Sequence, residues 1–303
     1  MRGRLMRNVS MARMTTWGTG GRADRVYVPA DVEDLADFLA GLGPRDEVLW
    51  VGLGSNLLVR DGGIGGVVIL TSRTLGRIEE PGGGLVRAGA GVPCAKLARH
   101  FAGRGLAGGE FLAGIPGTLG GALAMNAGAH GAETWDLVHR VETVDRNGGR
   151  RWRARDEFEV GYRSVAGAAA EWFAGAELRL VSEDPATVRA RTRGMIRARA
   201  ATQPVGERSC GSVFRNPPGD HAGRLVEACG LKGARVGGAV VSEKHGNFIV
   251  NERNASSSDI EALIGEVRSR VRDETGVDLE PEVRVVGRRP PSHQKDHGPG
   301  EGR

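Results

Sequence analysis

GIPGTLGGALAMNAGAHG, residues 114–131, is the most informative stretch of this 303-residue chain. It contains six glycines, no Asp, Glu, Lys or Arg, and apolar side chains such as Ile115 and Leu119 between the glycines. Glycine loses the most conformational freedom on folding, so a run this dense indicates backbone that turns sharply and lies close against a flat or anionic group. The interleaved apolar residues distinguish it from a disordered linker.

A second glycine-rich run, VGLGSNLLVRDGG, spans residues 51–63. A Rossmann-type dinucleotide fold does not fit it, because the third glycine of that fingerprint would fall on Leu57. No Gly-Lys-Ser/Thr follows, so a P-loop does not fit either. What remains is a tight loop that presents backbone N–H groups, Ser55 and Asn56 to a pyrophosphate, or an ordinary glycine turn. Two such runs in one chain favour a large phosphate-bearing cofactor held mainly by backbone.

Composition restricts the class of protein. The length allows about two domains, and 40% hydrophobic and 26% charged residues are ordinary for a globular protein. No apolar stretch is long enough for a membrane helix, so we expect no membrane insertion. The net charge of +5 comes from arginines spread along the chain without interleaved aromatics, so we expect no nucleic-acid partner.

Cysteine and histidine usage indicates a reducing compartment and no metal. Cys94, Cys210 and Cys229 form no CxxC pair, and the seven histidines form no HExxH motif. We therefore expect a cytoplasmic protein without a metal site. Cys210 could act as a thiol nucleophile with His221 or His245, but the spacing shows no activating arrangement, which favours a buried small residue.

Apolar periodicity predicts helices and strands in mixed order. Strands are expected at residues 26–29, 48–51, 67–70, 85–88, 138–145, 150–153, 248–251 and 282–286. Helices are expected at residues 32–40, 92–101, 185–200, 222–229 and 259–275. The predicted divisions are a flexible N-terminus (1–14), a two-part region (15–185, with subdomains at about 15–72 and 73–185), a connecting helix (186–204), a C-terminal domain (205–287) and a disordered tail (288–303).

Three polar groups are candidates for chemistry, and each also has an ordinary structural explanation. Arg163, in GYRS, could grip a carboxylate through two parallel hydrogen bonds, although exposed Tyr-Arg pairs are common. Ser212, in SCGSVFRNP, does not sit in the GxSxG elbow of a hydrolase. Glu282 precedes the last predicted strand, where an exposed strand-end carboxylate is the default. None of the three is decisive alone.

An ordered series of motifs carries a family resemblance. The chain contains, in this order, TTWGTGGRAD, VGLGSNLLV, GIPGTLGGALAMNAG, GYRS, SCGSVFRNP, SEKHGNFIVN and LEPEV. From about Thr15 to about Gly287 it closely resembles the compact subtype of the UDP-N-acetylenolpyruvoylglucosamine reductases (UDP-N-acetylmuramate dehydrogenases), flavoenzymes of peptidoglycan precursor synthesis. The resemblance implies an α+β fold, in which a two-part FAD-binding region of the vanillyl-alcohol-oxidase (PCMH) type is followed by a C-terminal α+β substrate-binding domain.

The resemblance also implies a reaction. NADPH would reduce non-covalently bound FAD and leave, and the enolpyruvyl ether of UDP-N-acetylglucosamine would then enter the same cleft and accept a hydride. Arg163 would bind and polarise the substrate carboxylate. Glu282, protonated or sharing a proton, would stabilise the enolate-like intermediate, and Ser212 would protonate the α-carbon.

Binding residues follow from the same resemblance. The residues that would contact FAD are Gly52, Gly54, Ser55, Asn56, Leu57, Ile115, Gly117, Thr118, Gly120, Gly121, Asn126 and Gly128. Tyr162, Arg215 and Asn216 would contact the substrate. Thr202 stands where relatives often carry a basic residue, and either Arg199 or Arg208 could take its place.

Two alternatives stay open at this point. The first is another flavoenzyme on the same scaffold, such as an alcohol or sugar oxidase. Such enzymes often attach their flavin through a His or Cys, and His130 lies in the glycine-rich run at residues 114–131. A non-enzymatic flavin- or nucleotide-binding module is the other, and it would not need Arg163, Ser212 and Glu282 together. We expect a monomer.

Overall fold

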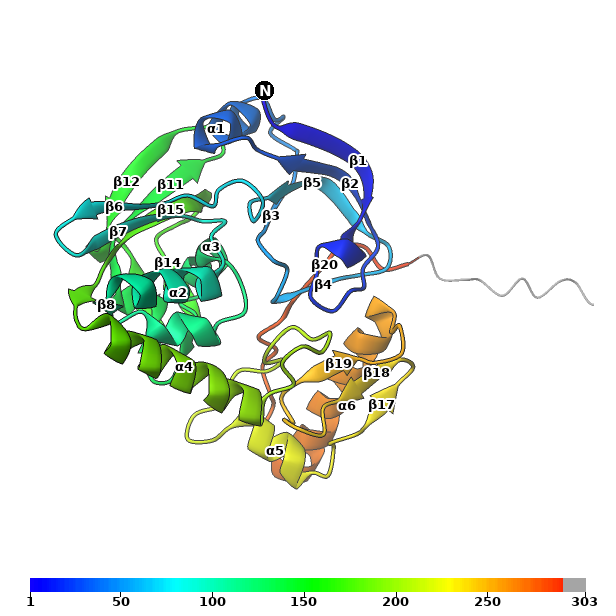
Figure 1. Ribbon diagram of the computed structural model, residues 1–303. Coiled ribbons are helices and arrows are strands. Elements are labelled where there is room, and N and C mark those ends of the chain that lie inside the picture. The colour runs from blue at the N-terminus through cyan, green and yellow to red at the C-terminus, as the bar shows by residue number, and fades with distance from the viewer. Residues whose placement is uncertain (291–303) are drawn as a thin grey trace, which may run out of the picture.

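The structure, a computed structural model, describes residues 1–290, which form three units (Figure 1). The tail predicted to be disordered begins at residue 288, and its part from residue 291 on lies outside the described residues. Arg288 is held in place, because its backbone N–H donates to the carbonyl of Gly63 at 2.8 Å. The ordered chain therefore extends slightly beyond the predicted boundary.

A four-stranded sheet and one helix make up the first unit. The strands lie in the order β1 (Arg4–Ser10), β2 (Arg22–Val28), β5 (Ile64–Leu70) and β3 (Val48–Val51). Helix α1 (Val32–Ala40) begins after Asp31, whose carboxylate accepts a hydrogen bond from the Asp34 N–H at 2.9 Å. Leu35 and Leu39 on α1 are buried in a core that the sheet shares. The predicted bounds of α1 and β3 are confirmed.

The N-terminus is a strand, so the prediction of a flexible segment at residues 1–14 is wrong. β1 pairs antiparallel with β2, from Arg4 opposite Val28 to Ser10 opposite Arg22. It lies at the edge of the sheet and remains partly exposed along its length. Edge strands often carry charged residues, and the arginines concealed this one in the sequence pattern.

The second unit is built on a five-stranded antiparallel sheet. Its strands lie in the order β12 (Arg150–Ala154), β11 (Val138–Asp145), β15 (Glu171–Arg179), β7 (Leu85–Gly89) and β6 (Ile78–Gly82). Helices α2 (Cys94–Arg104) and α3 (Leu119–Ala124) supply Leu97, Phe101 and Leu123 to the core that includes the sheet residues Val86 and Leu178. Gly105, at φ 66°, ends α2 in the left-handed conformation that glycine favours.

Short elements complete this part of the chain. Two-stranded pairs join β8 (Leu106–Ala107) to β16 (Val181–Ser182), β9 (Gly128–Ala129) to β10 (Ala132–Glu133), and β13 (Glu159–Gly161) to β14 (Ser164–Ala166). Short 3-10 helices in the second unit are η2 (Glu110–Gly114), η3 (Thr134–Asp136) and η4 (Arg155–Glu157), and η1 (Met11–Arg13) lies between β1 and β2 of the first unit. The glycine-rich run at residues 114–131 therefore contains α3 and β9 rather than one continuous loop.

Helix α4 (Pro185–Thr202) runs from the second unit to the C-terminal domain (Figure 1). That domain contains α5 (Ala222–Ala228), α6 (Ser257–Thr275) and a sheet in the order β17 (Arg235–Val236), β18 (Ala239–Val241) and β19 (Ile249–Asn251). One face of α6, as its spacing predicts, is buried through Ile260, Leu263, Ile264, Val267 and Val271. None of the helices within residues 1–290 is both long and apolar enough to cross a membrane.

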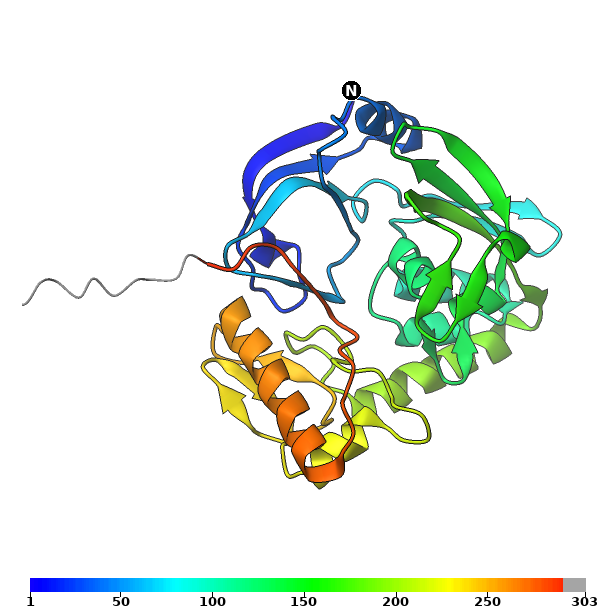
Figure 2. The ribbon, with the colours of Figure 1, turned by 180° about the vertical axis from the view of Figure 1, so that it is seen from behind.

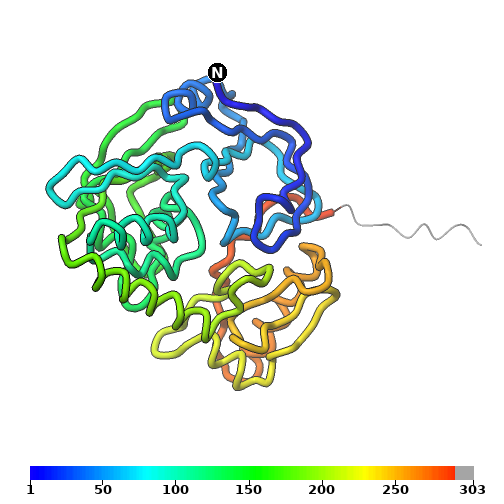
Figure 3. Tube along the Cα trace, viewed as in Figure 1, coloured from blue at the N-terminus to red at the C-terminus, as the bar shows by residue number. Residues whose placement is uncertain are grey.

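The first unit and the C-terminal domain each contribute a segment to the other. Strand β20 (Arg284–Val286) pairs in parallel with β4 (Leu57–Val59). β4 lies inside the glycine-rich run at residues 51–63, where the apolar pattern did not predict a strand. Figures 2 and 3 show the red C-terminal segment leaving the end of α6 and lying beside the first unit. In return, Trp17 is fully buried in the C-terminal core, and its Nε1 donates to the carbonyl of Ile249 at 2.8 Å.

Candidate cofactor and active site

A cavity of about 830 Å³ is lined by residues from all three units. It has the size range of a site for a small molecule or cofactor. Most of the residues that the sequence analysis singled out line it, namely Gly52, Gly54, Ser55, Asn56, Leu57, Ile115, Gly117, Thr118, Gly120, Gly121, Gly128, Arg163, Ser212 and Glu282. The structure therefore brings the two glycine-rich runs and the three candidate catalytic residues to one site.

The two glycine-rich runs contact each other along one wall of the cavity. A Cβ on Gly52 would lie 2.3 Å from Thr118 Oγ1, so only glycine allows this approach. Ser55 Oγ donates a hydrogen bond to the carbonyl of Pro116 at 2.6 Å. We call this wall, formed by residues 52–57 and 114–121, the glycine cradle.

Gly121 indicates that the cradle faces a ligand. Neighbouring Gly120 packs against protein, because a Cβ there would lie 2.9 Å from the Cβ of Ala90. A Cβ on Gly121 would meet only Thr118 Oγ1, at 4.0 Å, and Gly121 is exposed on the cavity wall. Nothing in the protein requires glycine at this position, which sits in α3. The open space fits a bulky group laid against backbone, such as FAD.

Asn126 does not line the cavity, contrary to its predicted role as an FAD contact. It is fully buried, and its amide donates to the carboxylate of Glu133 at 2.6 Å and to the carbonyl of Gly161 at 3.2 Å. Its Oδ1 accepts a hydrogen bond from the Trp135 N–H at 3.1 Å. The side chain thus joins the glycine-rich run to the β13–β14 hairpin and leaves no polar atom for a cofactor.

Arg163 lies in the two-residue loop of that hairpin, between the paired residues Gly161 and Ser164. Its φ of 53° is in the left-handed region, which a non-glycine residue occupies at an energetic cost and often at functional sites. Its Nε is 3.1 Å from Glu282 Oε1, but this buried N–H is not aligned for a hydrogen bond. The guanidinium is therefore held beside a carboxylate with donor capacity to spare.

Glu282 lies just before β20 and is fixed by its backbone. Its N–H donates to the carbonyl of Val213 at 2.8 Å, and its own carbonyl accepts a hydrogen bond from the Asn56 amide at 3.1 Å. Burial raises the pKa of the Glu282 carboxyl, and the positive charge of Arg163 opposes that rise. A carboxyl in this environment is suited to hold a proton and to donate it in a hydrogen bond.

Ser212 lies on a segment that a buried amide holds in place. The Phe214 N–H donates to Asn247 Oδ1 at 2.9 Å, and Asn247 Nδ2 donates back to the Phe214 carbonyl at 2.8 Å. Phe214 also forms a β-bridge with Pro281, and the Glu282 N–H bonds the carbonyl of Val213, so the segment that carries Ser212 lies beside Glu282. Sequence reasoning did not single out Asn247, although an amide at the start of an apolar strand in SEKHGNFIVN was an available signal.

The three predicted substrate contacts do not line the cavity. Tyr162 is 50% exposed and stacks under the guanidinium of Arg163 at 5.2 Å. Arg215 pairs with Glu280 at 3.1 Å, and Asn216 Oδ1 accepts a hydrogen bond from the N–H of Ala222 at the start of α5. Arg215 Nε is nevertheless buried without a hydrogen-bond partner within residues 1–290, and the charge of Arg215 lowers the pKa of Glu282, so this arginine lies near the site.

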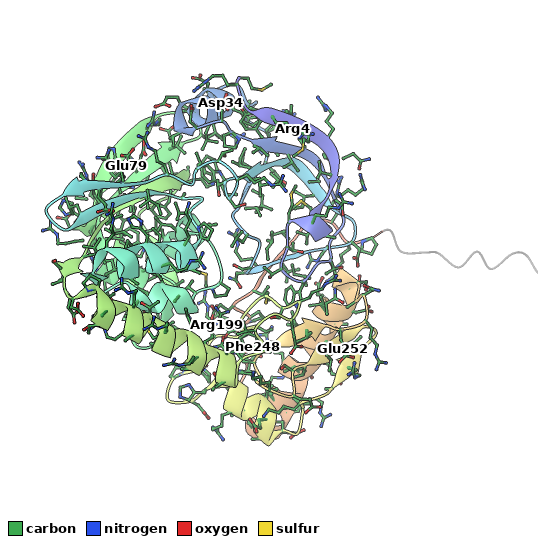
Figure 4. The ribbon with its side chains drawn as sticks, in the orientation of Figure 1. Arg4, Asp34, Glu79, Arg199, Phe248 and Glu252 are labelled. Carbon is green, nitrogen blue, oxygen red and sulfur yellow. The ribbon has the colours of Figure 1, made fainter. Side chains whose placement is uncertain are left out.

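The structure separates the two arginines that could replace a basic residue at Thr202. Arg199 and Thr202 line the cavity from the last turn of α4, whereas Arg208 packs on Gly18. Figure 4 labels Arg199 beside Phe248, where α4 meets the C-terminal domain. Arg199 Nε donates to Gln203 Oε1 at 3.0 Å, and burial lowers the pKa of its guanidinium. No carboxylate within residues 1–290 pairs with it.

Cys210 and His130 also line the cavity. Burial, together with the charge of Glu282, raises the pKa of the Cys210 thiol well above its usual range, so this cysteine is a poor nucleophile. That agrees with the expected buried small residue. Within residues 1–290, no group of three or more His, Cys, Asp and Glu side chains could hold a metal ion.

Comparisons with known proteins match each of the two parts of the chain to a known family. Residues 23–153 match a family described as FAD binding domain, and residues 203–286 match the C-terminal domain of UDP-N-acetylenolpyruvoylglucosamine reductase. The UDP-N-acetylenolpyruvoylglucosamine reductase of Methylococcus capsulatus is 57% identical over 286 residues, covering 94% of this chain and 94% of the relative. That of Alkalilimnicola ehrlichii is 56% identical, covering 91% of this chain and 93% of the relative.

A solved structure agrees with the sequence comparisons. The crystal structure of UDP-N-acetylenolpyruvylglucosamine reductase from Thermus caldophilus matches with a TM-score of 0.81 and 34% identity, over 94% of this chain and all of that one (100%). The chain thus combines an FAD-binding domain, which contains the glycine cradle, with the C-terminal domain of UDP-N-acetylenolpyruvoylglucosamine reductase, and both parts are α+β in structure. The chain therefore belongs to the family of UDP-N-acetylenolpyruvoylglucosamine reductases and is an FAD-dependent oxidoreductase.

Proposed function

We propose that this chain reduces the enolpyruvyl ether of UDP-N-acetylglucosamine to UDP-N-acetylmuramate in the cytoplasm, with NADPH as electron donor. The observation that carries the proposal is the meeting of Arg163, Glu282 and Ser212 beside the glycine cradle in one cavity. The printed names of the relatives supply the substrate class. When bound in the cradle, FAD would supply the two-electron chemistry, taking a hydride from NADPH and giving one to the terminal vinyl carbon.

Arg163 would bind the carboxylate of the enolpyruvyl group. Addition of a hydride to the terminal carbon pushes an electron pair toward that carboxylate, so negative charge appears there only as the reaction proceeds. A fixed cation at this point stabilises the transition state more than the ground state, which raises the rate. Its left-handed backbone and its contact with Glu282 hold the guanidinium in place before substrate binds.

Glu282 would complete this stabilisation as a protonated carboxyl. Burial raises the pKa of this carboxyl, and a carboxyl that holds a proton can donate a hydrogen bond to the developing enolate oxygen. A neutral Glu282 also leaves the charge of Arg163 available for the substrate. The two residues would thus act as one donor pair.

Ser212 would give its hydroxyl proton to the α-carbon, completing the addition of hydride and proton across the double bond. Serine is a weak acid, but a carbanion-like carbon is a strong base, and correct placement supplies most of the remaining rate. Within residues 1–290 no group hydrogen bonds to Ser212 Oγ, so the hydroxyl is free to turn toward the substrate.

Arg199 would bind the diphosphate of the UDP moiety. It is a cavity-lining guanidinium without a carboxylate partner, and its two Nη groups remain available after Nε bonds Gln203. Arginine matches the geometry of phosphate oxygens through two parallel N–H groups. It lies one helical turn from Thr202, so it can serve the position where a basic side chain is missing.

The proposal is tested by following flavin absorbance without oxygen. NADPH should bleach the purified protein, and UDP-N-acetylglucosamine enolpyruvate should restore the colour while one UDP-N-acetylmuramate forms per flavin. UDP-N-acetylglucosamine, which lacks the enolpyruvyl group, is the control and should restore nothing. Bleaching of the flavin by a sugar or an alcohol in the absence of NADPH, or yellow colour that stays on the acid-precipitated protein, would instead support an oxidase with flavin attached at His130. A size-exclusion run at micromolar concentration would check the expected monomer.

A further inference from the structure

We propose that Asn126 is a positioning residue for the reaction, because it holds the hairpin that carries Arg163 against the glycine-rich run at residues 114–131. Asn126 lies in that run just after α3, is fully buried and has a left-handed φ of 45°. Asparagine is one of the few non-glycine residues that adopt this conformation readily. The inference rests on the role that the proposed function gives to Arg163.

The β13–β14 hairpin needs support from outside its own strands. Its two strands form a sheet of their own and do not extend the five-stranded sheet. Their residues are exposed or half-buried, with Val160 and Val165 packed against the core of the second unit. A segment with so few buried contacts moves readily unless directional bonds hold it. β14 lies against α3, so the end of α3 is well placed to supply such bonds (Figure 1).

The partners of the Asn126 amide determine which way it faces. Its Oδ1 accepts a hydrogen bond from the Trp135 N–H at 3.1 Å, and a backbone N–H can only donate. Its Nδ2 therefore faces the Glu133 carboxylate at 2.6 Å and the Gly161 carbonyl at 3.2 Å, which both accept. Two of these bonds lie within the turn at residues 126–135. The third fixes the base of the hairpin, because Gly161 precedes its two-residue loop.

The backbone of Asn126 also contacts the guanidinium of Arg163. Arg163 Nη1 donates to the Asn126 carbonyl at 3.5 Å, the long end of the hydrogen-bond range, while Nε lies 3.1 Å from Glu282 Oε1. Asn126 thus holds both the backbone beside Arg163 and one end of its side chain. Displacing a reacting or binding group by about 1 Å can cost 100-fold in rate, so this support matters for the reaction.

Asn126 also has a purely structural role to be distinguished from this one. Its bonds to Trp135 and Glu133 stabilise the turn that carries Gly128, which lines the cavity. A structural role alone would lower FAD content or slow bleaching by NADPH, whether or not Arg163 is present. A positioning role slows the step in which Arg163 binds the substrate carboxylate, and it vanishes when the guanidinium is removed.

The test variant combines Asn126→Asp with Glu133→Gln in the full-length, FAD-loaded protein. The new carboxylate keeps an acceptor for the Trp135 N–H, and the new glutamine amide can donate to that carboxylate, so the turn keeps its bonds. The Gly161 carbonyl loses the side-chain donor. Reoxidation of the reduced enzyme by the enolpyruvyl substrate should slow about 10- to 100-fold. FAD content and bleaching by NADPH should stay within about twofold of the parent protein.

Thr134→Val is the matched control. It removes a buried hydrogen bond from the same turn, between Thr134 Oγ1 and the Ala127 carbonyl at 2.7 Å, and leaves the bonds to the hairpin intact. It should change neither half-reaction. Asn126→Gly repeats the test without moving a charge, because glycine accepts the φ of 45° and removes the amide.

A double-mutant cycle with Arg163→Ala separates positioning from general damage. In that background the paired substitution at 126 and 133 should slow reoxidation no further, because no guanidinium is left to position. Slowing of full size in the Arg163→Ala background would overturn the assignment. Reoxidation at the parental rate in both Asn126 variants would overturn it as well, and so would loss of FAD or of the fold from both.

Amide hydrogen exchange measures the hairpin without any substrate. Residues 159–166 should exchange about five- to tenfold faster in the paired variant than in the parent protein or in Thr134→Val, as loss of one hydrogen bond predicts. Unchanged exchange would show that Asn126 does not hold the hairpin. This measurement stays valid even if the parent protein does not accept the enolpyruvyl substrate, so the inference and the proposed function can fail separately.

Discussion

The glycine cradle and the catalytic trio Arg163, Ser212 and Glu282 are built in opposite ways. The cradle comes from two continuous runs and works through the side chains it lacks, as Gly52 against Thr118 shows. The trio comes from three separate segments and works through the side chains it has. The glycine cradle can therefore be recognised from local sequence, because it is made of two continuous runs. The catalytic residues come together only when the chain folds.

The same difference predicts how each region fails. A change in the cradle should reduce FAD affinity and leave the reaction of any bound flavin nearly intact. A change in the trio should reduce reaction with the substrate and leave FAD in place.

Arg163→Ala should slow the reoxidation of reduced enzyme by the enolpyruvyl substrate about 10³-fold, as expected for removal of one preorganised charge. FAD content and bleaching by NADPH should stay unchanged. Arg163→Gly is the matched variant: it should be equally slow but more stable than the alanine form, because glycine accepts the φ of 53° without strain. Stopped-flow absorbance and thermal unfolding measure both effects. Loss of FAD from either variant would contradict the separation.

Gly121→Ala should weaken FAD binding by about 10- to 100-fold, because the added methyl projects into the cavity rather than into protein. The flavin-free variant should be more stable than the parent, by up to about 1 kcal/mol, since alanine is the better helix residue in α3. Fluorescence titration with FAD and urea unfolding provide the two values. A less stable variant with unchanged FAD affinity would show that Gly121 serves packing.

Glu177 belongs to neither region. Its substitution tests whether a lower stability of the fold is enough to reduce FAD affinity or the reaction with the substrate. Its carboxylate is buried beside Arg140 and Arg87, whose hydrogen bonds lower its pKa from 4.5 to about 2. A lowered pKa stabilises the fold above pH 4.5, and this contribution is lost as the pH falls toward 2. Glu177→Gln should therefore cost about 2 kcal/mol at pH 7 and less at pH 3.

The measurement is urea unfolding at the two pH values, with FAD affinity determined in parallel at pH 7. FAD affinity and the rates of both half-reactions should match those of the parent protein. Equal destabilisation at pH 7 and pH 3 would show that the ion pairs contribute nothing through the ionised carboxylate. Selective loss of FAD would mean that the cradle depends on the second unit's stability.

Arg199→Gln should raise KM for the enolpyruvyl substrate about tenfold, with kcat and FAD affinity unchanged, because a diphosphate contact remote from the reacting carbons aids binding uniformly. Arg197→Gln is the control, since Arg197 is exposed on α4 and does not line the cavity. Steady-state kinetics on both variants decide the point. Equal effects in both would indicate general attraction by the charge of α4 rather than a contact.

The cradle can be predicted from local sequence to a greater extent than the trio. Local pattern predicts α1, β3 and β11 with the observed bounds, and it finds the cradle. It misses β1, an arginine-rich edge strand, and β4, whose partner β20 is distant in sequence. The pairing of β4 with β20 places Glu282 beside Asn56, so the trio follows from family resemblance and not from spacing.

Individual contacts are the least predictable part. Asn126 and Asn216 lie in the matching motifs, yet their amides bond groups inside the protein: the Glu133 carboxylate and the Gly161 carbonyl for Asn126, and the Ala222 N–H for Asn216. Arg215 likewise pairs with Glu280 rather than facing the cavity. Whether a polar side chain faces a ligand or its own fold depends on tertiary neighbours that a motif does not specify. Asn247 is the opposite example: the sequence did not single it out, yet its amide holds the segment that carries Ser212.

If the cradle holds FAD while the trio carries out the reaction, Ser212→Ala should separate the two functions. The measurement is stopped-flow absorbance of the two half-reactions in this variant and in the parent protein. The account predicts full FAD content, parental bleaching by NADPH, and reoxidation by the enolpyruvyl substrate slowed by about 10²- to 10⁴-fold, the range for loss of a positioned proton donor. Reoxidation at the parental rate, or a variant that no longer holds FAD, would contradict it.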